Sequence, residues 1–133
     1  MERFLGSYSS YIYSLLRIVA GLLFLMHGTQ KLFGWPLKLP MPVDTMTTAI
    51  GVFEVIAGLM IIIGLFASIF AFIASGMLAV GYFMIHQPTG TWPIQNGGEP
   101  AVLLCFIFLY IAARGSGAFS VDAMRRRNVS AGK

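Results

Sequence analysis

A long stretch without a single charged side chain constrains this chain more than any other feature. From Val55 to Gly98 there is no Asp, Glu, Lys or Arg. A soluble protein of 133 residues could not keep so long a run away from water, whereas a lipid bilayer accepts it. Charged residues make up 11% of the whole chain, against roughly 25% in soluble domains, and the mean hydropathy is +0.79. The sequence therefore predicts an all-α integral membrane protein.

Helical segments of membrane-spanning length can be placed along the chain. A helix rises about 1.5 Å per residue, so crossing a hydrocarbon core of about 30 Å takes roughly 20 residues. Four segments meet this requirement: 11–33, 45–66, 67–86 and 97–119. The fourth contains Arg114, which must extend its side chain toward the lipid headgroups. We expect one transmembrane domain, 1–133, folded as a four-transmembrane-helix antiparallel bundle with a basic tail, 120–133.

The connections between the predicted spans differ in character. Residues 64–68, Gly-Leu-Phe-Ala-Ser, are too short and apolar for an aqueous loop, so they indicate a tight antiparallel hairpin or one bent helix. The longer connections, 34–44 and 87–98, contain both tryptophans and most of the prolines. Proline stops helices and tryptophan favours the membrane interface. These two connections are therefore expected at the membrane surface.

Basic residues predict the orientation, because cytoplasmic segments of membrane proteins carry an excess of Lys and Arg. The run Arg125-Arg126-Arg127 outweighs Lys31 and Lys38 of the first connection, which favours a cytoplasmic C-terminus. An even number of spans then places the N-terminus in the cytoplasm as well. The arginine run could alternatively bind anionic lipid. We predict no nucleic-acid partner, because no aromatic-studded basic face is present.

Ionisable side chains at membrane depth are costly and normally face the protein interior. Helical periodicity places small and polar residues on shared stripes: Arg17, Gly21, Phe24, His27, Gly28 and Lys31 on the first span, Thr47, Gly51, Glu54 and Gly58 on the second, and Ala71, Ser75, Ala79, Tyr82 and His86 on the third. Small residues let helix backbones approach closely in lipid. The stripes are therefore expected to face one another.

The heights of these residues within the membrane suggest their partners. His27 and Glu54 lie within about one helical turn of each other in height, so they could meet. Arg17 lies roughly 10 Å nearer the cytoplasm, which makes an Arg17–Glu54 pair less direct. The outer half of the bundle then collects most of the ionisable groups: His27, Lys31, Glu54, His86 and Glu99, with Gln30 and Asn96 close by.

Two interpretations of this collection stay open. In the first, Glu54 and its partner form a structural pair that fixes helix register, while Lys31 and Glu99 extend to the interface. In the second, an outward-opening polar pocket binds a small molecule or passes protons, since histidines titrate near neutral pH. The second assigns catalytic roles to Glu54, His27 and His86, and ligand-binding roles to Arg17, Lys31, Gln30, Asn96 and Glu99. We predict no metal site, because local ligand spacing is absent.

Taken in order, these residues resemble the DoxX family of small bacterial membrane proteins. The resemblance rests on Arg17, Gly21, His27-Gly28 and Lys31-Leu32, then Glu54, Gly58 and Gly64-Leu65, then His86, Asn96-Gly97-Gly98-Glu99, Gly115-Ser116-Gly117 and Ser120-Val121-Asp122. It covers almost the whole chain. One departure is Phe66-Ala67-Ser68, where many family members carry a basic residue.

The resemblance implies a four-helix protein of the bacterial inner (plasma) membrane. Some family members are described as subunits of thiosulfate:quinone or quinol oxidoreductases, or as membrane anchors of redox-protective complexes. We therefore expect a respiration-associated subunit whose pocket takes a quinone or a small sulfur compound and which works with a redox partner protein. Whether the chain is itself an enzyme stays open. The alternatives are a non-catalytic scaffold for a partner protein and a small proton-coupled transporter, which would require a homo-oligomer.

Overall fold

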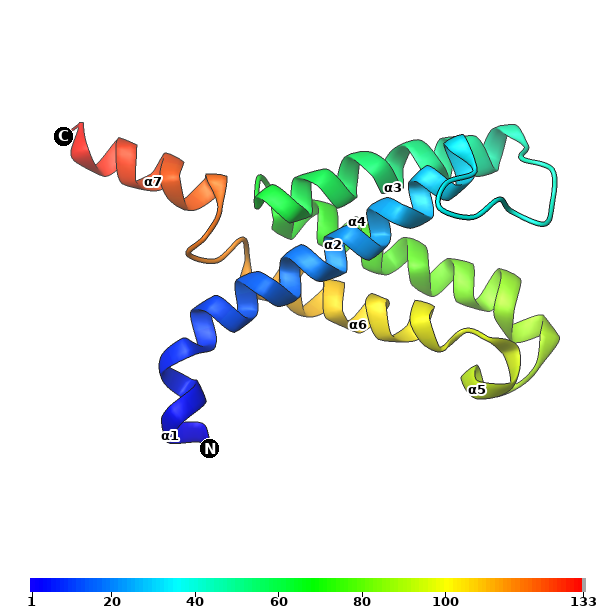
Figure 1. The fold of residues 1–133 in the computed structure, drawn as a ribbon, viewed down its shortest axis with the longest axis horizontal. Coiled ribbons are helices and arrows are strands. Elements are labelled where there is room, and N and C mark those ends of the chain that lie inside the picture. Colours follow the sequence, from blue (N-terminus) through cyan, green and yellow to red (C-terminus); the bar gives the residue numbers. More distant parts are fainter. Residues whose placement is uncertain (133) are drawn as a thin grey trace.

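The computed structural model describes residues 1–132, and the chain is built of helices with no strand among them (Figure 1). The elements follow in the order α1 (Glu2–Leu5), η1 (Gly6–Tyr8), α2 (Ser9–Phe33), α3 (Thr45–Ile63), α4 (Ala67–Gly81), the π-helix η2 (Tyr82–His86), η3 (Gln87–Thr89), α5 (Pro93–Asn96), α6 (Glu99–Arg114) and α7 (Val121–Ala131). The expected all-α fold is confirmed.

Three helical segments are long and apolar enough to cross a membrane: Glu2–Phe33, Thr45–Ile63 and Ala67–Thr89. The fourth expected segment, 97–119, is helical only over Glu99–Arg114. Its expected continuation to Phe119 does not occur, because Gly115 and Gly117 take positive φ angles of 86° and 78° and break the helix. With 16 residues, α6 is about 24 Å long, somewhat less than the thickness of the hydrocarbon core.

Two separate helices, not one bent helix, follow the first long connection. The Asp44 carboxylate caps α3 by accepting a hydrogen bond from the amide of Thr47 at 2.8 Å, and the side chain of Thr47 together with this amide holds the pKa of Asp44 below its usual range. Gly64, with φ 70°, ends α3, and α4 begins at Ala67 in the reverse direction (Figure 1). The expected tight hairpin is thereby confirmed.

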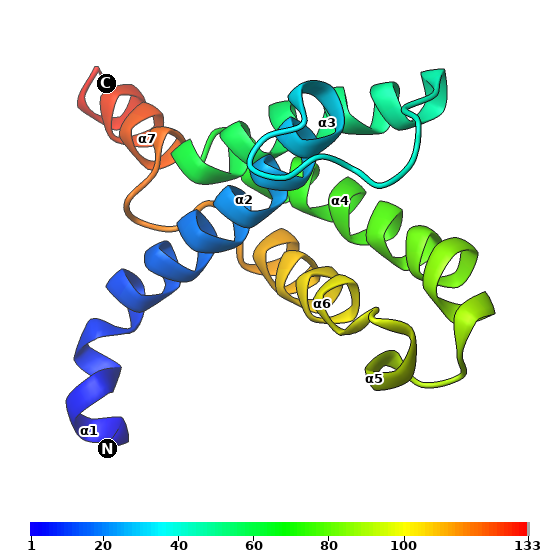
Figure 2. The same ribbon diagram turned by 45° about the vertical axis from the view of Figure 1, so that its right-hand side comes forward.

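The helices pack as two pairs, α2 with α3 and α4 with α6, and the two pairs meet near the middle of the molecule (Figure 2). Phe24 of α2 and Phe108 of α6, both fully buried, join the pairs with ring centroids 5.0 Å apart. Around them lie the alanines and isoleucines of the core: Ala57, Ile61, Ala71, Ala74 and Ile111. The outward faces are apolar as well, as at Phe72 and Phe106, each 65% exposed, which suits a lipid environment.

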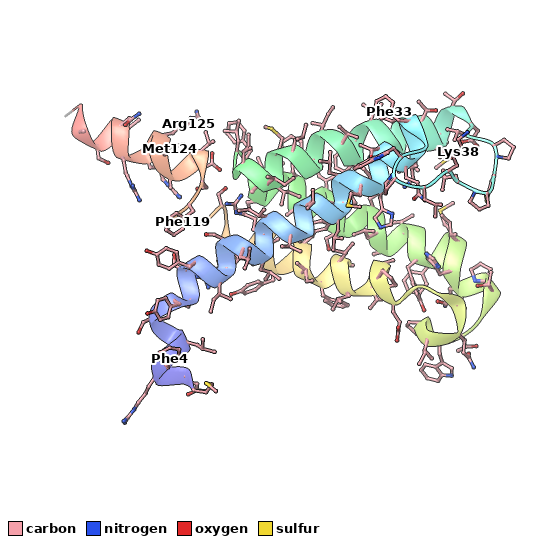
Figure 3. All side chains as sticks on the ribbon, in the orientation of Figure 1. Phe4, Phe33, Lys38, Phe119, Met124 and Arg125 are labelled. Atoms are coloured by element: carbon pink, nitrogen blue, oxygen red, sulfur yellow. The ribbon has the colours of Figure 1, made fainter. Side chains whose placement is uncertain are left out.

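The two termini and the α3–α4 turn lie at one end of the molecule. Connections 34–44 and 87–98 lie toward the other end, although they belong to different helix pairs and are spread apart (Figures 1 and 2). Side chains project from all faces of the helices, including the apolar outer faces (Figure 3). The helix α7 extends away from the helix pairs, beside the α3–α4 turn (Figure 1). We call the end with the termini the tail end and the opposite end the loop end.

Candidate polar site at the loop end of the α2–α3 pair

Glycines bring α2 and α3 into backbone contact. A Cβ atom added to Gly28 would lie 2.8 Å from the carbonyl oxygen of Gly51 and 2.8 Å from the amide nitrogen of Val55. A Cβ atom added to Gly58 would lie 2.8 Å from the amide nitrogen of Leu25. No side chain fits in this space, which is why small residues recur there. The expected contact between the glycine stripes of the first two spans is confirmed.

This close approach brings Lys31 of α2 to Glu54 of α3. The ammonium nitrogen of Lys31 lies 2.9 Å from Oε1 and 2.8 Å from Oε2 of Glu54 and donates to both. The side chains of Lys31 and Glu54 are 19% and 6% exposed. A charge pair so well removed from solvent costs desolvation free energy, and its attraction offsets that cost only while both partners are present.

A pocket lies beside Lys31, between the end of α2 and the connection 34–44, and Lys31 lines it whereas Glu54 does not. Its volume is about 490 Å³. Gln30, Lys31, Lys38 and Thr48 supply its polar lining, and Leu32, Phe33, Leu39, Met41 and Val43 are among its apolar lining residues. Pockets of this size, with an apolar lining and a few polar groups, are typical of small-molecule sites.

Glu54 meets neither of the partners that the heights suggested. His27 is exposed rather than turned toward α3, because it lies at the edge of the α2 stripe. Lys31, expected to extend to the interface in the structural interpretation, instead turns inward to Glu54, and its Nζ also lies 3.5 Å from the His27 carbonyl oxygen. The long side chain of Lys31 reaches the Glu54 carboxylate from one turn further along α2.

Arg17 lies at the tail end of the same helix pair, far along α3 from Glu54, and is fully buried. Its guanidinium donates to the carbonyl oxygens of Ile61 and of Ile62, the latter at 2.7 Å, and to that of Phe119 at 2.5 Å. The first two carbonyls belong to the last turn of α3, where the helix dipole favours a cation. The Arg17–Glu54 pair is therefore not formed, and Arg17 lies outside the loop-end pocket.

His86 and Asn96 form a second polar cluster, on the α4–α6 pair. Since a carbonyl oxygen only accepts, Nδ1–H of His86 donates to the Asn96 carbonyl oxygen at 3.1 Å. The Asn96 amide donates to the Tyr82 hydroxyl at 3.1 Å and to the Gly90 carbonyl oxygen at 2.9 Å. Glu99 is exposed in the first turn of α6. The eight candidate residues are thus divided among three places rather than gathered in one pocket.

Sequence reasoning missed the role of the segment 115–122. The Asp122 carboxylate accepts hydrogen bonds from the Phe66 amide at 2.9 Å and from the Ser116 hydroxyl at 2.6 Å, and its own amide donates to Gly64 at 3.1 Å. Ser120 caps α7 by accepting from the Ala123 amide. We call Arg17, Ser116, Ser120 and Asp122 the tail-end latch. Ser120-Val121-Asp122 after two glycines is an N-cap signal that could have indicated it.

Within residues 1–132, no three His, Cys, Asp or Glu side chains lie close enough together to hold a metal ion. Cys105 is a free thiol whose Sγ contacts Ser75 of the facing helix α4. The loop-end pocket offers ammonium and amide groups, and so it is suited to an oxygen-bearing organic molecule or an anion.

Comparison with known proteins identifies the family. The DoxX family profile matches residues 12–87, which is more than half of the chain. A Haemophilus influenzae protein described as uncharacterized is 36% identical over 125 residues, which cover 89% of this chain and 93% of that protein. No solved structure matches. The chain belongs to the DoxX family of membrane proteins, as its motifs had indicated.

Proposed function

We propose that the chain crosses the bacterial inner (plasma) membrane four times, with both termini in the cytoplasm. Both termini and the arginines of α7 lie at the tail end, and the tryptophan-containing connections lie at the loop end. The helix α6 is short, but Glu99 and Arg114 at its two ends can reach the headgroups on either side.

Cysteine labelling of positions 38 and 130 from outside intact cells tests this orientation. Position 38 should react and position 130 should not, and the reverse pattern would contradict the orientation.

The loop-end site, in this proposal, binds a quinone headgroup or a small oxyanion of sulfur as part of a respiration-associated complex. The observation that carries the proposal is the part-buried Lys31–Glu54 ion pair, whose lysine lines a pocket of about 490 Å³. An N–H of the Lys31 ammonium can exchange one of its present acceptors for a carbonyl or anionic oxygen of the ligand, and the paired carboxylate can exchange a proton with that ammonium group. The mixed lining fits a ring that has polar oxygens and an apolar body.

The candidate residues then have distinct proposed roles. Lys31 and Gln30 hold the ligand, and Glu54 exchanges the proton, with the exposed His27 as a relay to solvent. His86 and Asn96 stabilise the conformation of the connection 87–98 through their hydrogen bonds, and Arg17 and Glu99 lie outside the pocket. The chain supplies binding and proton exchange, and a redox partner protein supplies the electrons.

Binding measurements on the purified full-length protein test this proposal. A short-chain benzoquinone and thiosulfate are the probes, and one of them should bind saturably. Lys31→Gln should weaken that binding about tenfold, through loss of a charge-assisted hydrogen bond. Arg126→Gln, which removes an exposed cation at the other end, is the matched control and should bind like the wild type. Absence of saturable binding of both probes, or equal binding by both variants, would contradict the proposal.

A second candidate function, a scaffold for a partner protein, is favoured by α7. This helix extends from the bundle with Arg125, Arg126 and Arg127 exposed, while Asp122 fixes its first turn to the α3–α4 turn. A rigidly mounted basic helix suits a partner with an acidic surface. Arg126→Glu combined with Arg127→Glu leaves the latch intact. If co-purification of a partner is lost in this variant and kept in Lys31→Gln, the scaffold function is supported over the pocket.

A further inference from the structure

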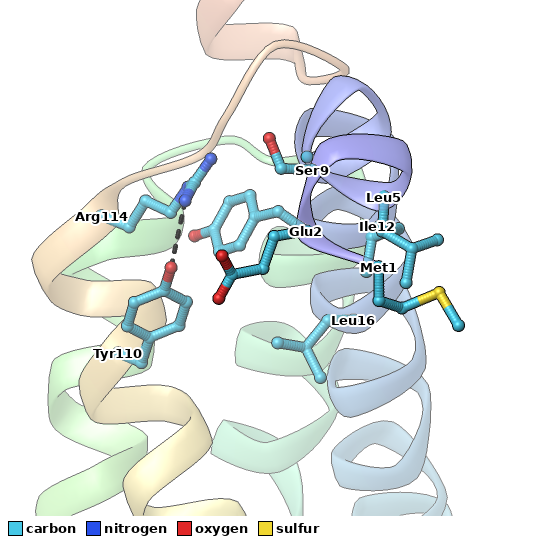
Figure 4. Close-up of a pocket in the computed structure, with 10 residues that line it drawn as sticks. Met1, Glu2, Leu5, Ser9, Ile12, Leu16, Tyr110 and Arg114 are labelled. Atoms are coloured by element: carbon cyan, nitrogen blue, oxygen red, sulfur yellow. Dashed lines mark hydrogen bonds between the residues drawn. The ribbon is translucent and has the colours of Figure 1, made fainter.

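A groove at the tail end holds two opposite charges that do not pair. It lies between α1, the beginning of α2 and the end of α6, with a volume of about 490 Å³ (Figure 4). Glu2 of α1 and Arg114 of α6 both line it. No ion pair joins these two side chains, although both belong to the described part of the chain. The groove therefore presents a carboxylate and a guanidinium that are free to bind a third group.

Arg114 is oriented by a hydroxyl group and an aromatic ring, and no carboxylate among residues 1–132 forms an ion pair with it. Its Nη1 donates to the Tyr110 hydroxyl at 3.0 Å, and its guanidinium carbon lies 4.4 Å from the centre of the Tyr13 ring (Figure 4). The hydroxyl and the aromatic ring fix the orientation of the guanidinium but leave its charge uncompensated. The remaining N–H groups can donate to a phosphate, which guanidinium recognises well.

The rest of the groove is apolar. Leu5, Ile12 and Leu16 line it along one side of the N-terminal helical segment, and each is at least 37% exposed. Because Arg114 ends α6, the polar part of the groove lies at the depth of lipid headgroups and the apolar part runs along the spans. The geometry matches a molecule with a charged head and a long apolar chain.

We propose that this groove binds a zwitterionic phospholipid with a primary ammonium in its headgroup. The phosphate accepts hydrogen bonds from Arg114, the ammonium donates to Glu2, and an acyl chain lies along Leu5, Ile12 and Leu16. The charges select the headgroup. A phosphatidylglycerol offers no cation to Glu2, and the quaternary ammonium of phosphatidylcholine has no N–H to donate. The site is independent of the loop-end pocket.

Native mass spectrometry of the purified full-length protein tests this inference. The delipidated protein is mixed with equal amounts of phosphatidylethanolamine, phosphatidylcholine and phosphatidylglycerol. The wild type should bind phosphatidylethanolamine about fivefold in excess of either of the others, as expected for one additional charge-assisted hydrogen bond near the surface. Glu2→Gln should abolish this preference while phospholipid is still bound, and Arg114→Gln should weaken binding of all three lipids. Arg126→Gln, an exposed cation outside the groove, should behave like the wild type.

A second variant keeps the test decisive if Arg114→Gln does not fold. Gly6 lines the groove, its backbone is helical, and a Cβ atom added there meets nothing within 4 Å. Gly6→Leu should therefore fill the groove without disturbing the fold and should abolish lipid retention. Equal binding of the three lipids by the wild type, or unchanged retention in Gly6→Leu, would overturn the proposal. A dimer that Gly6→Leu dissociates would overturn it too, since the groove would then hold a second copy.

Discussion

The two ends of the α2–α3 pair stabilise a cation with different groups, main-chain carbonyl oxygens at one end and a carboxylate side chain at the other. At the tail end, Arg17 is surrounded by backbone carbonyl oxygens from α3 and from the segment before α7, and no carboxylate within residues 1–132 forms an ion pair with it. At the loop end, Lys31 is paired with Glu54 and remains 19% exposed beside a pocket. A cation bound by main-chain carbonyls is fixed by the fold itself, whereas a side-chain ion pair at a pocket can exchange one partner for a ligand. We infer that the first end holds the structure together, whereas the function that we propose belongs to the second.

The largest effect expected from this comparison is on stability at the tail end. Arg17→Met removes the hydrogen bonds of the guanidinium and leaves buried carbonyl oxygens without their donor. The free energy of unfolding should fall by about 3–5 kcal/mol, in the range seen when a buried charged group loses its partners. Denaturant unfolding in detergent measures this, with the exposed Arg126→Met as the control. If both variants were equally stable, Arg17 would not be a structural residue.

The next effect separates stability from binding at the loop end. Lys31→Met leaves the Glu54 carboxylate buried without a partner, so the free energy of unfolding should fall by about 2–4 kcal/mol. Combining Lys31→Met with Glu54→Gln removes both charges and should return stability to within about 1 kcal/mol of the wild type. Binding of the benzoquinone or thiosulfate probe should stay lost in the double variant. Restored stability together with restored binding would show that the ion pair is only structural.

A smaller effect tests the glycine contact that brings Lys31 to Glu54. A methyl group at Gly28 would meet the backbone of Gly51 and Val55, so Gly28→Ala should cost about 1–3 kcal/mol through overpacking. Gly76 is exposed on α4, and a Cβ atom there meets nothing within 4 Å. Gly76→Ala should therefore raise the free energy of unfolding by about 0.4–1 kcal/mol, because alanine favours the helix and nothing obstructs its methyl group. Thermal unfolding of both variants measures this difference. Equal midpoint temperatures would contradict the close approach of α2 and α3.

The smallest effect concerns the cap of α3 at the loop end. The side chain and the amide of Thr47 lower the pKa of Asp44, so the carboxylate stabilises the folded state above its unfolded pKa and loses this contribution as the pH falls through its folded pKa. Asp44→Asn keeps the cap but does not titrate. From neutral pH down to below about pH 4, the midpoint temperature of the wild type should fall slightly more than that of the variant. If the midpoint temperatures of the two proteins changed with pH in parallel, the charge of the Asp44 carboxylate would not contribute to the stability of the folded state.

Much of the fold could be predicted from local properties of the sequence. Helix lengths followed from apolar runs, the contact between α2 and α3 from the spacing of Gly21, Gly28, Gly51 and Gly58, and the α3–α4 hairpin from Gly64. The fourth segment was predicted too long, because the length needed to cross a membrane was given more weight than the two glycines that end the helix. Periodicity indicates which side of a helix is polar, but it does not give helix ends to within a turn.

The partners of the polar side chains could not be predicted in this way. Lys31 and His27 lie one turn apart on α2, and the relative rotation of α2 and α3 decides that Lys31 reaches Glu54. The bond between Arg17 and Phe119 joins residues 102 positions apart, and no local pattern encodes such a contact. His86 and Glu54 were placed in one pocket because both were assigned to the outer half of the bundle, but they belong to different helix pairs whose loop ends are spread apart (Figures 1 and 2).

The sequence by itself determined that this protein is a helical membrane protein of the DoxX family, because a long uncharged run is stable only in lipid and only as helices that satisfy their own backbone hydrogen bonds. The tertiary structure alone decided which charge neutralises which. A buried charge takes the partner that helix rotation and side-chain length bring within hydrogen-bond distance, and both depend on contacts between residues far apart in the chain. For this reason Glu54 is paired with Lys31, and Arg17 is bound by the main chain.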